Sequence, residues 1–146
     1  MNEAHIVFGV AAIVVNALAA LFGAWGWWRG TQNRWFWRLL RAGQASILVE
    51  VVAGGIYYLI KQHAPGLHIL YGGLPLAVSF IAEGLRANSA QLILDKHGHE
   101  SAQAVGRLPA DEQRAVVVEI LRREMGTMTL AALVVAALLA RAWMTG

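Results

Sequence analysis

Two histidines stand at matching places in the chain and could together ligate a metal. His5 is at the start of the first apolar stretch, and His68 is at the start of the third. Neutral imidazole is a common ligand of metal ions and of haem iron. If both stretches are helices that run in the same direction, the two rings lie at the same depth. The sequence therefore predicts one haem b, or another metal, between His5 and His68.

The helix faces that carry these histidines are built from small and weakly polar residues. Such faces leave room for a flat cofactor, but they are equally typical of membrane helices that pack closely. A histidine at a helix end is also common without any ligand, so both interpretations stay open. His63 is a third candidate and is expected to be a loop residue. By helical periodicity the stripe of His5 contains Gly9, Ala12, Asn16, Ala19 and Gly23, and that of His68 contains Gly72, Pro75, Ser79, Ala82 and Arg86.

Glu50 is the one charged residue in the second apolar stretch. A central ionisable group costs about 2.5–3.5 kcal/mol on insertion scales, so it normally faces the bundle interior and has a partner. As a functional group it would handle protons or contact a quinone. As a structural group it would donate a hydrogen bond to Asn16 or Ser79. These three residues complete the candidate cofactor-binding set with His5 and His68.

A polar cluster is expected near the other end of the third apolar stretch. Glu83 and Arg86 lie one turn apart there, and charged and amide residues of other segments are expected at the same depth. The cluster is either a salt-bridge network that anchors helix ends or a site for an anionic head group. The other expected members are Arg41, Gln44, Arg122, Arg123 and Glu124.

The remaining sequence offers little chemistry. Residues 95–100, Asp-Lys-His-Gly-His-Glu, have the composition of a metal site but no recognisable ligand spacing, and a solvated turn is expected. The chain has no cysteine, which excludes disulfides, iron–sulfur clusters and cysteine nucleophiles. Catalytic triads, paired catalytic carboxylates and phosphate-binding glycine loops are not evident. The sequence favours a protein that is not an enzyme, and it specifies no reaction.

Helices that cross a bilayer have to position these residues. Of the 146 residues 58% are hydrophobic and only 14% are charged, too few to cover a soluble domain of this size. About 20 apolar residues span the hydrocarbon core of about 30 Å. The first stretch is too long for a signal peptide and follows no basic region. We expect one domain over 1–146, with spans at about 5–28, 39–61, 67–86 and 125–144.

Basic residues predict the orientation of these spans. Four arginines lie in 28–41, around the link between the first two spans, and six Lys or Arg lie in 86–124, whereas the opposite side has only Lys61 and Arg141. The positive-inside rule then places both basic segments in the cytoplasm and both termini outside the cell membrane. We therefore read the net charge of +3 as a sign of topology and expect no nucleic-acid partner. An aromatic belt at the inner boundary agrees with this orientation, and it consists of Trp25, Trp27, Trp28, Trp35 and Trp37.

Short links between spans favour an all-α, up-down-up-down bundle of four membrane helices. The third and fourth helices are expected to extend into the cytoplasm as a helical hairpin over about 87–124. No helix breaker interrupts 86–96, and Pro109 suits the first turn of the next helix. Within this hairpin Glu119 and Arg123 are spaced for an i, i+4 ion pair.

Four membrane helices with level histidines on two parallel ones resemble the plan of small membrane b-type cytochromes. The resemblance is one of architecture, without a family motif, and it implies electron transfer or haem handling. A second hypothesis is an accessory or assembly subunit of a larger membrane complex, in which the apolar stretch 127–140 faces lipid or a partner subunit. A third is proton-coupled transport by a homo-oligomer, with Glu50 as the coupling carboxyl.

Overall fold

A computed structural model describes residues 3–61 and 65–146, and every regular element in these ranges is an α-helix. Among the described residues, four helical stretches are long and apolar enough to cross a membrane. The predicted all-α class with four long apolar helices is thereby confirmed. The elements are α1 (Glu3–Arg29), α2 (Arg34–Lys61), α3 (Gly66–Ala87), α4 (Ser89–Lys96), α5 (Ala102–Val105) and α6 (Ala110–Thr145).

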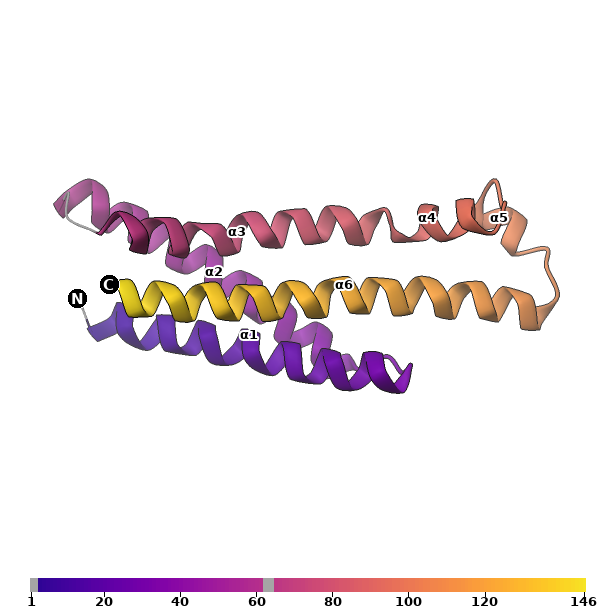
Figure 1. Cartoon of the computed structure of the whole chain (residues 1–146), viewed down its shortest axis with the longest axis horizontal. Coiled ribbons are helices and arrows are strands. Elements are labelled where there is room, and N and C mark those ends of the chain that lie inside the picture. The colour runs from indigo at the N-terminus through magenta and orange to yellow at the C-terminus, as the bar shows by residue number, and fades with distance from the viewer. Residues whose placement is uncertain (1–2, 62–64) are drawn as a thin grey trace.

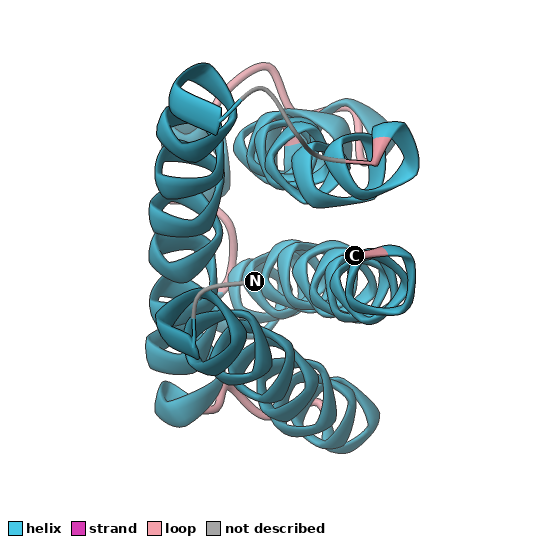
Figure 2. Cartoon of the chain, turned by 90° about the vertical axis from the view of Figure 1, so that its left-hand side faces the viewer, coloured by secondary structure: helices cyan, strands magenta, loops and turns pink. Residues whose placement is uncertain are grey.

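Three of the long helices, α1, α6 and α3, lie side by side as a layer, and α2 crosses one face of this layer (Figures 1 and 2). The helix α6 occupies the middle, where it packs extensively against both α1 and α3. The helices α1 and α3 begin at the end of the layer where α6 finishes, and we call this the histidine end (Figure 1). The opposite end carries α4 and α5, and we call it the hairpin end.

The central position of α6 means that only part of the stretch 127–140 is free to face lipid or a partner subunit, as at Leu130 and Leu133, which are more than half exposed. Half of its most apolar window is buried inside the protein, against 11–28% for the other three long helices. Small residues make this possible, because they let two neighbouring backbones approach α6 from opposite sides. The buried small residues of α6 are Gly126, Ala132, Ala136 and Ala142.

The centre of the protein is packed around Phe36 of α2 and Met128 of α6, both fully buried. Gly23 of α1 lies directly against this cluster. A Cβ atom at Gly23 would come within 2.3 Å of Oγ1 of Thr129 and 2.7 Å of the Phe36 ring. A second buried cluster, toward the histidine end, consists of Ala12, Ile47, Val135 and Leu139.

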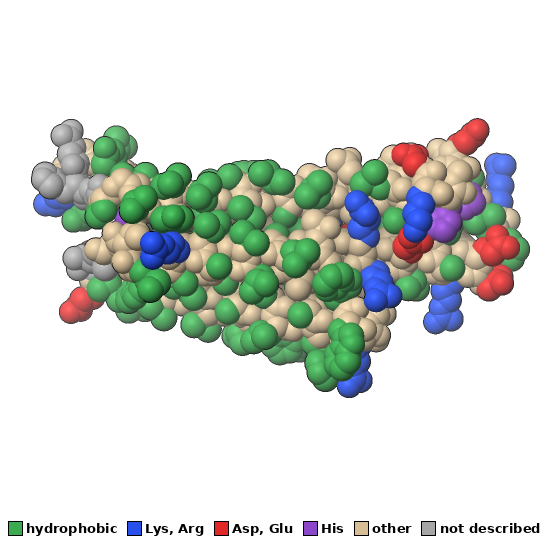
Figure 3. All heavy atoms as spheres, viewed as in Figure 1, with side chains coloured by type: hydrophobic (Ala, Val, Ile, Leu, Met, Phe, Trp, Pro, Cys, Tyr) green, Lys and Arg blue, Asp and Glu red, His purple; other side chains and the backbone are tan. Residues whose placement is uncertain are grey.

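Apolar and charged side chains are concentrated in different regions along the long axis of the molecule. In Figure 3 hydrophobic side chains cover most of the length from the histidine end, whereas most of the charged side chains gather toward the hairpin end. Many large apolar side chains are exposed on α1, α2 and α3, for example Phe80, which is 70% exposed. A surface of this kind suits an apolar surrounding rather than water.

The third helix extends to Lys96 as expected, with one short interruption. The helix α3 ends at Ala87, and α4 continues from Ser89 after Asn88. The Ser89 hydroxyl donates to the carbonyl of Leu85, one turn earlier, at 3.0 Å. Such a back-bond competes with the helical ladder and often bends a helix, which explains the interruption. The tip contains the short helix α5, whose start is capped by the side chain of Ser101.

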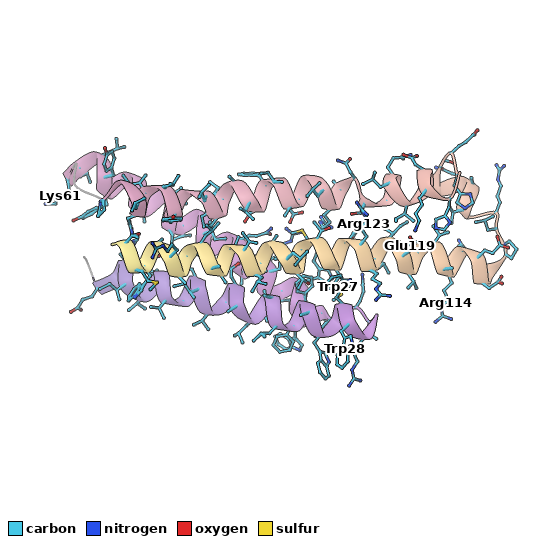
Figure 4. The ribbon with its side chains drawn as sticks, in the orientation of Figure 1. Trp27, Trp28, Lys61, Arg114, Glu119 and Arg123 are labelled. Atoms are coloured by element: carbon cyan, nitrogen blue, oxygen red, sulfur yellow. The ribbon has the colours of Figure 1, made fainter. Side chains whose placement is uncertain are left out.

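An apolar cluster and an acidic residue of α6 attach α4 and α5 to α6. Glu119 accepts from Nζ of Lys96 at 2.6 Å and contacts Nε2 of His97 at 2.7 Å. The expected pair of Glu119 with Arg123 is therefore wrong, because both carboxylate oxygens face α4 and not along α6 (Figure 4). The turn expected at 95–100 is only partly confirmed: Asp95 and Lys96 still belong to α4, and the turn follows at 97–98, with Gly98 at a φ of 70°. The apolar cluster consists of Ile93, Leu94, Val105 and Val116.

Replacing Glu119 with glutamine is expected to loosen α4 and α5 while the rest of the protein stays folded. Hydrogen bonds from Lys96 and His97 lower the pKa of the Glu119 carboxyl below its ordinary value. The carboxylate therefore stabilises the hairpin fully above the ordinary carboxyl pKa, and this contribution is lost as the pH falls through the lowered pKa. Amide hydrogen exchange in 89–105 should accelerate in E119Q, and acid should abolish the difference from the native chain. Glu112→Gln, on the same helix, is the control that should leave exchange in 89–105 unchanged.

Candidate functional site

The histidine end brings together His5 of α1 and His68 of α3. Their ring centroids are 5.8 Å apart, and the ring planes meet at 70°. The two residues are separated by most of the first half of the chain, so only the folding of α1 and α3 against α6 unites them. The described structure therefore places the two predicted imidazoles in one site.

Each ring has an acceptor at its Nδ1 atom. Nδ1 of His5 lies 2.9 Å from Oε2 of Glu50, and Nδ1 of His68 lies 3.0 Å from the backbone carbonyl of Ala142. With these acceptors the proton of a neutral imidazole rests on Nδ1, and Nε2 keeps its lone pair. No described residue makes a hydrogen bond or ion pair with Nε2 of either ring. Metal-binding histidines are typically oriented in this way, with the second nitrogen bonded to a carboxylate or a carbonyl.

Glu50 reaches the site from α2, which crosses the layer at this point. Its side chain is 12% exposed, and that of His5 is 34% exposed. The carboxylate is thus largely covered by protein and bonded to the imidazole. Neither Asn16 nor Ser79 is its partner, so this part of the structural expectation for Glu50 is wrong.

Asn16 and Ser79 lie deeper in the protein, away from the histidines. Each follows its histidine by about three helical turns, a distance of roughly 16 Å along the helix axis. The Asn16 amide donates to the Ala12 carbonyl at 2.9 Å, and the Ser79 hydroxyl donates to the Pro75 carbonyl at 2.8 Å. Both polar groups are therefore satisfied within their own helices, and the structure does not bring them to the histidine site.

The space beside the histidines is more open than the centre of the protein. Gly9 and Gly72 each follow a histidine by one turn on the same helix face. A Cβ atom at either position would meet no neighbouring atom within 4 Å. At Gly43, near the centre, an added Cβ would come within 2.6 Å of the Asn16 side chain. Small residues thus serve close packing at the centre, whereas no neighbouring side chain packs against Gly9 or Gly72.

The polar cluster predicted near the hairpin end is also present. Glu83 accepts from Arg41, from Gln44 at 2.9 Å and from Arg86 at 2.9 Å. Arg86 extends the network to Glu124, 3.9 Å away. The cluster thus joins α2, α3 and α6, and five of the seven expected members take part. Arg122 and Arg123 make none of its contacts within the described chain.

Sequence reasoning missed the part that α6 has in the histidine site. The Ala142 carbonyl bonds His68, and a Cβ at Gly146 would come within 2.6 Å of Nδ1 of His68. Backbone carbonyls carry no residue-type signal, so no pattern in the sequence points to this contact. The third candidate, His63, lies outside the described residues.

No protein-family model, no curated protein and no solved structure matches this chain. Within 3–61 and 65–146, no group of three or more His, Asp or Glu side chains is placed to hold a metal ion. A function has to be inferred from the geometry of the histidine site.

Proposed function

We propose that the chain is a four-span membrane protein that holds one haem b between His5 and His68 and serves electron transfer or haem handling. The observation that carries this proposal is the meeting of the two imidazoles, each with an acceptor at Nδ1 and an unused Nε2. The ring centroids are 5.8 Å apart, so both imidazoles are close enough to contact one bound group. His5 and His68 would hold the haem iron through their Nε2 atoms.

Haem fits this donor set better than a bare metal ion does. A structural or catalytic zinc site uses three or four protein ligands, and the described residues offer no such group. A porphyrin brings four nitrogen ligands of its own, so that two histidines complete the coordination of its iron. The chain has no cysteine, which leaves histidine as the natural axial ligand here.

The surroundings of the two rings leave room at two positions. Gly9 and Gly72 lie one turn from each histidine on the same helix face, and a Cβ atom at either position would meet no neighbouring atom within 4 Å. A haem held by both imidazoles would lie at the histidine end, beside the C-terminal end of α6. Glu50 would orient His5 through its Nδ1–H and make that imidazole a stronger donor to the iron.

The proposed membrane arrangement has the four long helices alternating up, down, up, down. The basic residues around 29–41 and 86–123 then lie in the cytoplasm, and the histidine end lies near the outer face of the cell membrane. The exposed apolar surface along most of the molecule in Figure 3 supports such a surrounding. An iron centre near one face of a membrane is suitably placed to exchange electrons with a partner on that side.

The purified protein, expressed with ample haem, is expected to show a Soret absorption band that shifts on reduction. His5→Ala or His68→Ala should remove the band, because each deletes one axial ligand. His99→Ala is the matched control, since His99 lies in the turn at the hairpin end, and it should leave the spectrum unchanged. Gly9→Leu tests the space beside the iron and should lower haem content while both histidines remain.

A colourless native protein would refute the haem proposal. If that protein also purified with a second membrane chain, the accessory-subunit hypothesis would take its place. Proton flux in liposomes that Glu50→Gln abolishes would instead favour transport. Retention of the full spectrum in both single histidine variants would mean that other residues hold the iron.

A further inference from the structure

An open hollow lies near the hairpin end, where α2 begins, and it is distinct from the histidine site. Its volume is about 590 Å³. Three of its five lining residues are arginines, and none is acidic. The lining consists of Gln32, Arg34, Trp37, Arg38 and Arg41.

We propose that this hollow binds the phosphate head group of an anionic phospholipid. Arg34, Arg38 and Arg41 follow one another at intervals of four and three positions, so their side chains lie on one face of α2. The planar guanidinium group forms paired hydrogen bonds to phosphate oxygens, which makes arginine the preferred residue for such anions. Three guanidinium groups around one hollow therefore match a phosphate better than they match a neutral ligand.

The arginines differ in how firmly they are already held. Arg41 donates to Gln44 at 2.6 Å and to Glu83, so it is fixed by the polar cluster. The guanidinium of Arg38 lies over the Trp35 ring, 5.3 Å from its centroid. Arg34 has no hydrogen bond or ion pair with any described residue. Arg41 is thus held in place by protein contacts, whereas Arg34 and Arg38 remain available to bind an anion.

The charge around the hollow stays positive after these contacts are counted. Glu83 is the nearest acid, and it is shared between Arg41 and Arg86. Arg86 also lies over the Trp37 ring, 5.7 Å from its centroid, and comes within 3.9 Å of Glu124. Two carboxylates therefore face four guanidinium groups in this region, and an anion would reduce the mutual repulsion.

The position of the hollow favours a lipid over a soluble phosphate. Trp37 lines it, and tryptophans close to it in sequence are well exposed: Trp35 is 59% and Trp28 is 76% exposed. Exposed tryptophan at the end of an apolar surface is typical of the head-group level of a bilayer. Beyond the hollow, α2 presents exposed apolar side chains, including Leu48 and Val52, along which acyl chains can lie. A lipid would thus contact arginine with its head and apolar side chains with its tails.

Lipid binding to the purified, delipidated full chain in an uncharged detergent tests this proposal. Native mass spectrometry should show retention of phosphatidylglycerol in preference to phosphatidylcholine with the same acyl chains. Arg34→Gln combined with Arg38→Gln should reduce this preference by about tenfold, which corresponds to the loss of strong paired hydrogen bonds. Arg41 is left unchanged because it also holds Glu83. Circular dichroism should show the same helix content in the variant, since both substituted residues are exposed.

The matched control is Arg107→Gln combined with Arg114→Gln, which removes the same charge from the hairpin end. Arg114 points away from the rest of the protein there (Figure 4). Equal losses in both double variants, or no preference for phosphatidylglycerol in the native chain, would overturn the proposal. Displacement of the lipid by an equal concentration of glycerol phosphate would identify a soluble phosphate as the source and overturn the lipid assignment. This proposal rests only on the membrane part of the proposed function. If the chain stays soluble without detergent, the membrane proposal is refuted. If the chain needs detergent but shows no lipid preference, only the lipid site is refuted.

Discussion

Replacing Phe36 with alanine is expected to destabilise the fold by roughly 3 kcal/mol, the largest loss that we expect from a single side chain. Phe36 is fully buried between α1, α2 and α6, where its ring fills the centre of the main apolar cluster. Lipid or detergent chains are as apolar as the protein interior, so the change in surrounding adds little to the cost. The lost packing contacts and the remaining cavity account for most of it. Reversible SDS titration in detergent micelles, followed by circular dichroism, measures the change.

Phe80→Ala provides the matched control. Phe80 is 70% exposed on α3, so the same truncation there leaves no cavity inside the protein. The unfolding midpoint of this variant should stay close to that of the native chain. Equal shifts in both variants would contradict the central position of Phe36.

Replacing Gly23 with alanine is expected to destabilise the protein by about 1–2 kcal/mol, although alanine is the better helix former. Overpacking of a filled core costs about 1–3 kcal/mol, whereas removal of a glycine from a helix gains about 0.5–1 kcal/mol. The added Cβ would lie 2.3 Å from Oγ1 of Thr129 and 2.7 Å from the Phe36 ring, so these buried side chains or their helices have to shift. The same titration measures this loss.

Gly84→Ala is the control, and it is expected to stabilise the protein slightly instead of destabilising it. A Cβ at Gly84 of α3 meets no neighbouring atom within 4 Å, so only the gain in helix propensity remains. Thr129→Ala should recover part of the loss caused by Gly23→Ala, because it removes the closest contact. The Thr129 hydroxyl has no hydrogen-bond partner among the described residues, so its removal costs little. A stabilising effect of Gly23→Ala alone would show that α1 and α2 are not packed closely at this point.

The polar cluster was predictable because its members had to lie at one depth. Charged residues at the ends of long apolar helices gather at the same level, and Glu83 lies close to Arg41 and Arg86 there. The same argument about depth brought His5 and His68 together, since each begins a helix that runs from one end of the layer. In both cases the constant rise of the α-helix converts sequence position into height.

The partners of single polar groups were harder to foresee. Helix periodicity pairs Glu50 with Asn16 or Ser79, but Glu50 bonds His5 because α2 crosses the layer obliquely and brings its second half to the start of α1. Spacing pairs Glu119 with Arg123 on its own helix, but the carboxylate bonds Lys96 and His97 instead. Tilt and hairpin geometry depend on packing between helices, which the spacing within one helix does not encode.

Composition and periodicity are sufficient to predict four long apolar helices and to bring His5 and His68 to one level, because these depend on local propensity and on the rise of a helix. They do not give the level of Glu50, which depends on the tilt of α2. The order in which the helices stand beside one another came only from the folded chain. A uniformly apolar α6 has the same sequence pattern whichever of its sides is buried, and the close approach of α1 and α3 decides that its small residues are the ones inside the protein. Close approach is a property of two surfaces together, so a single helix sequence does not reveal it.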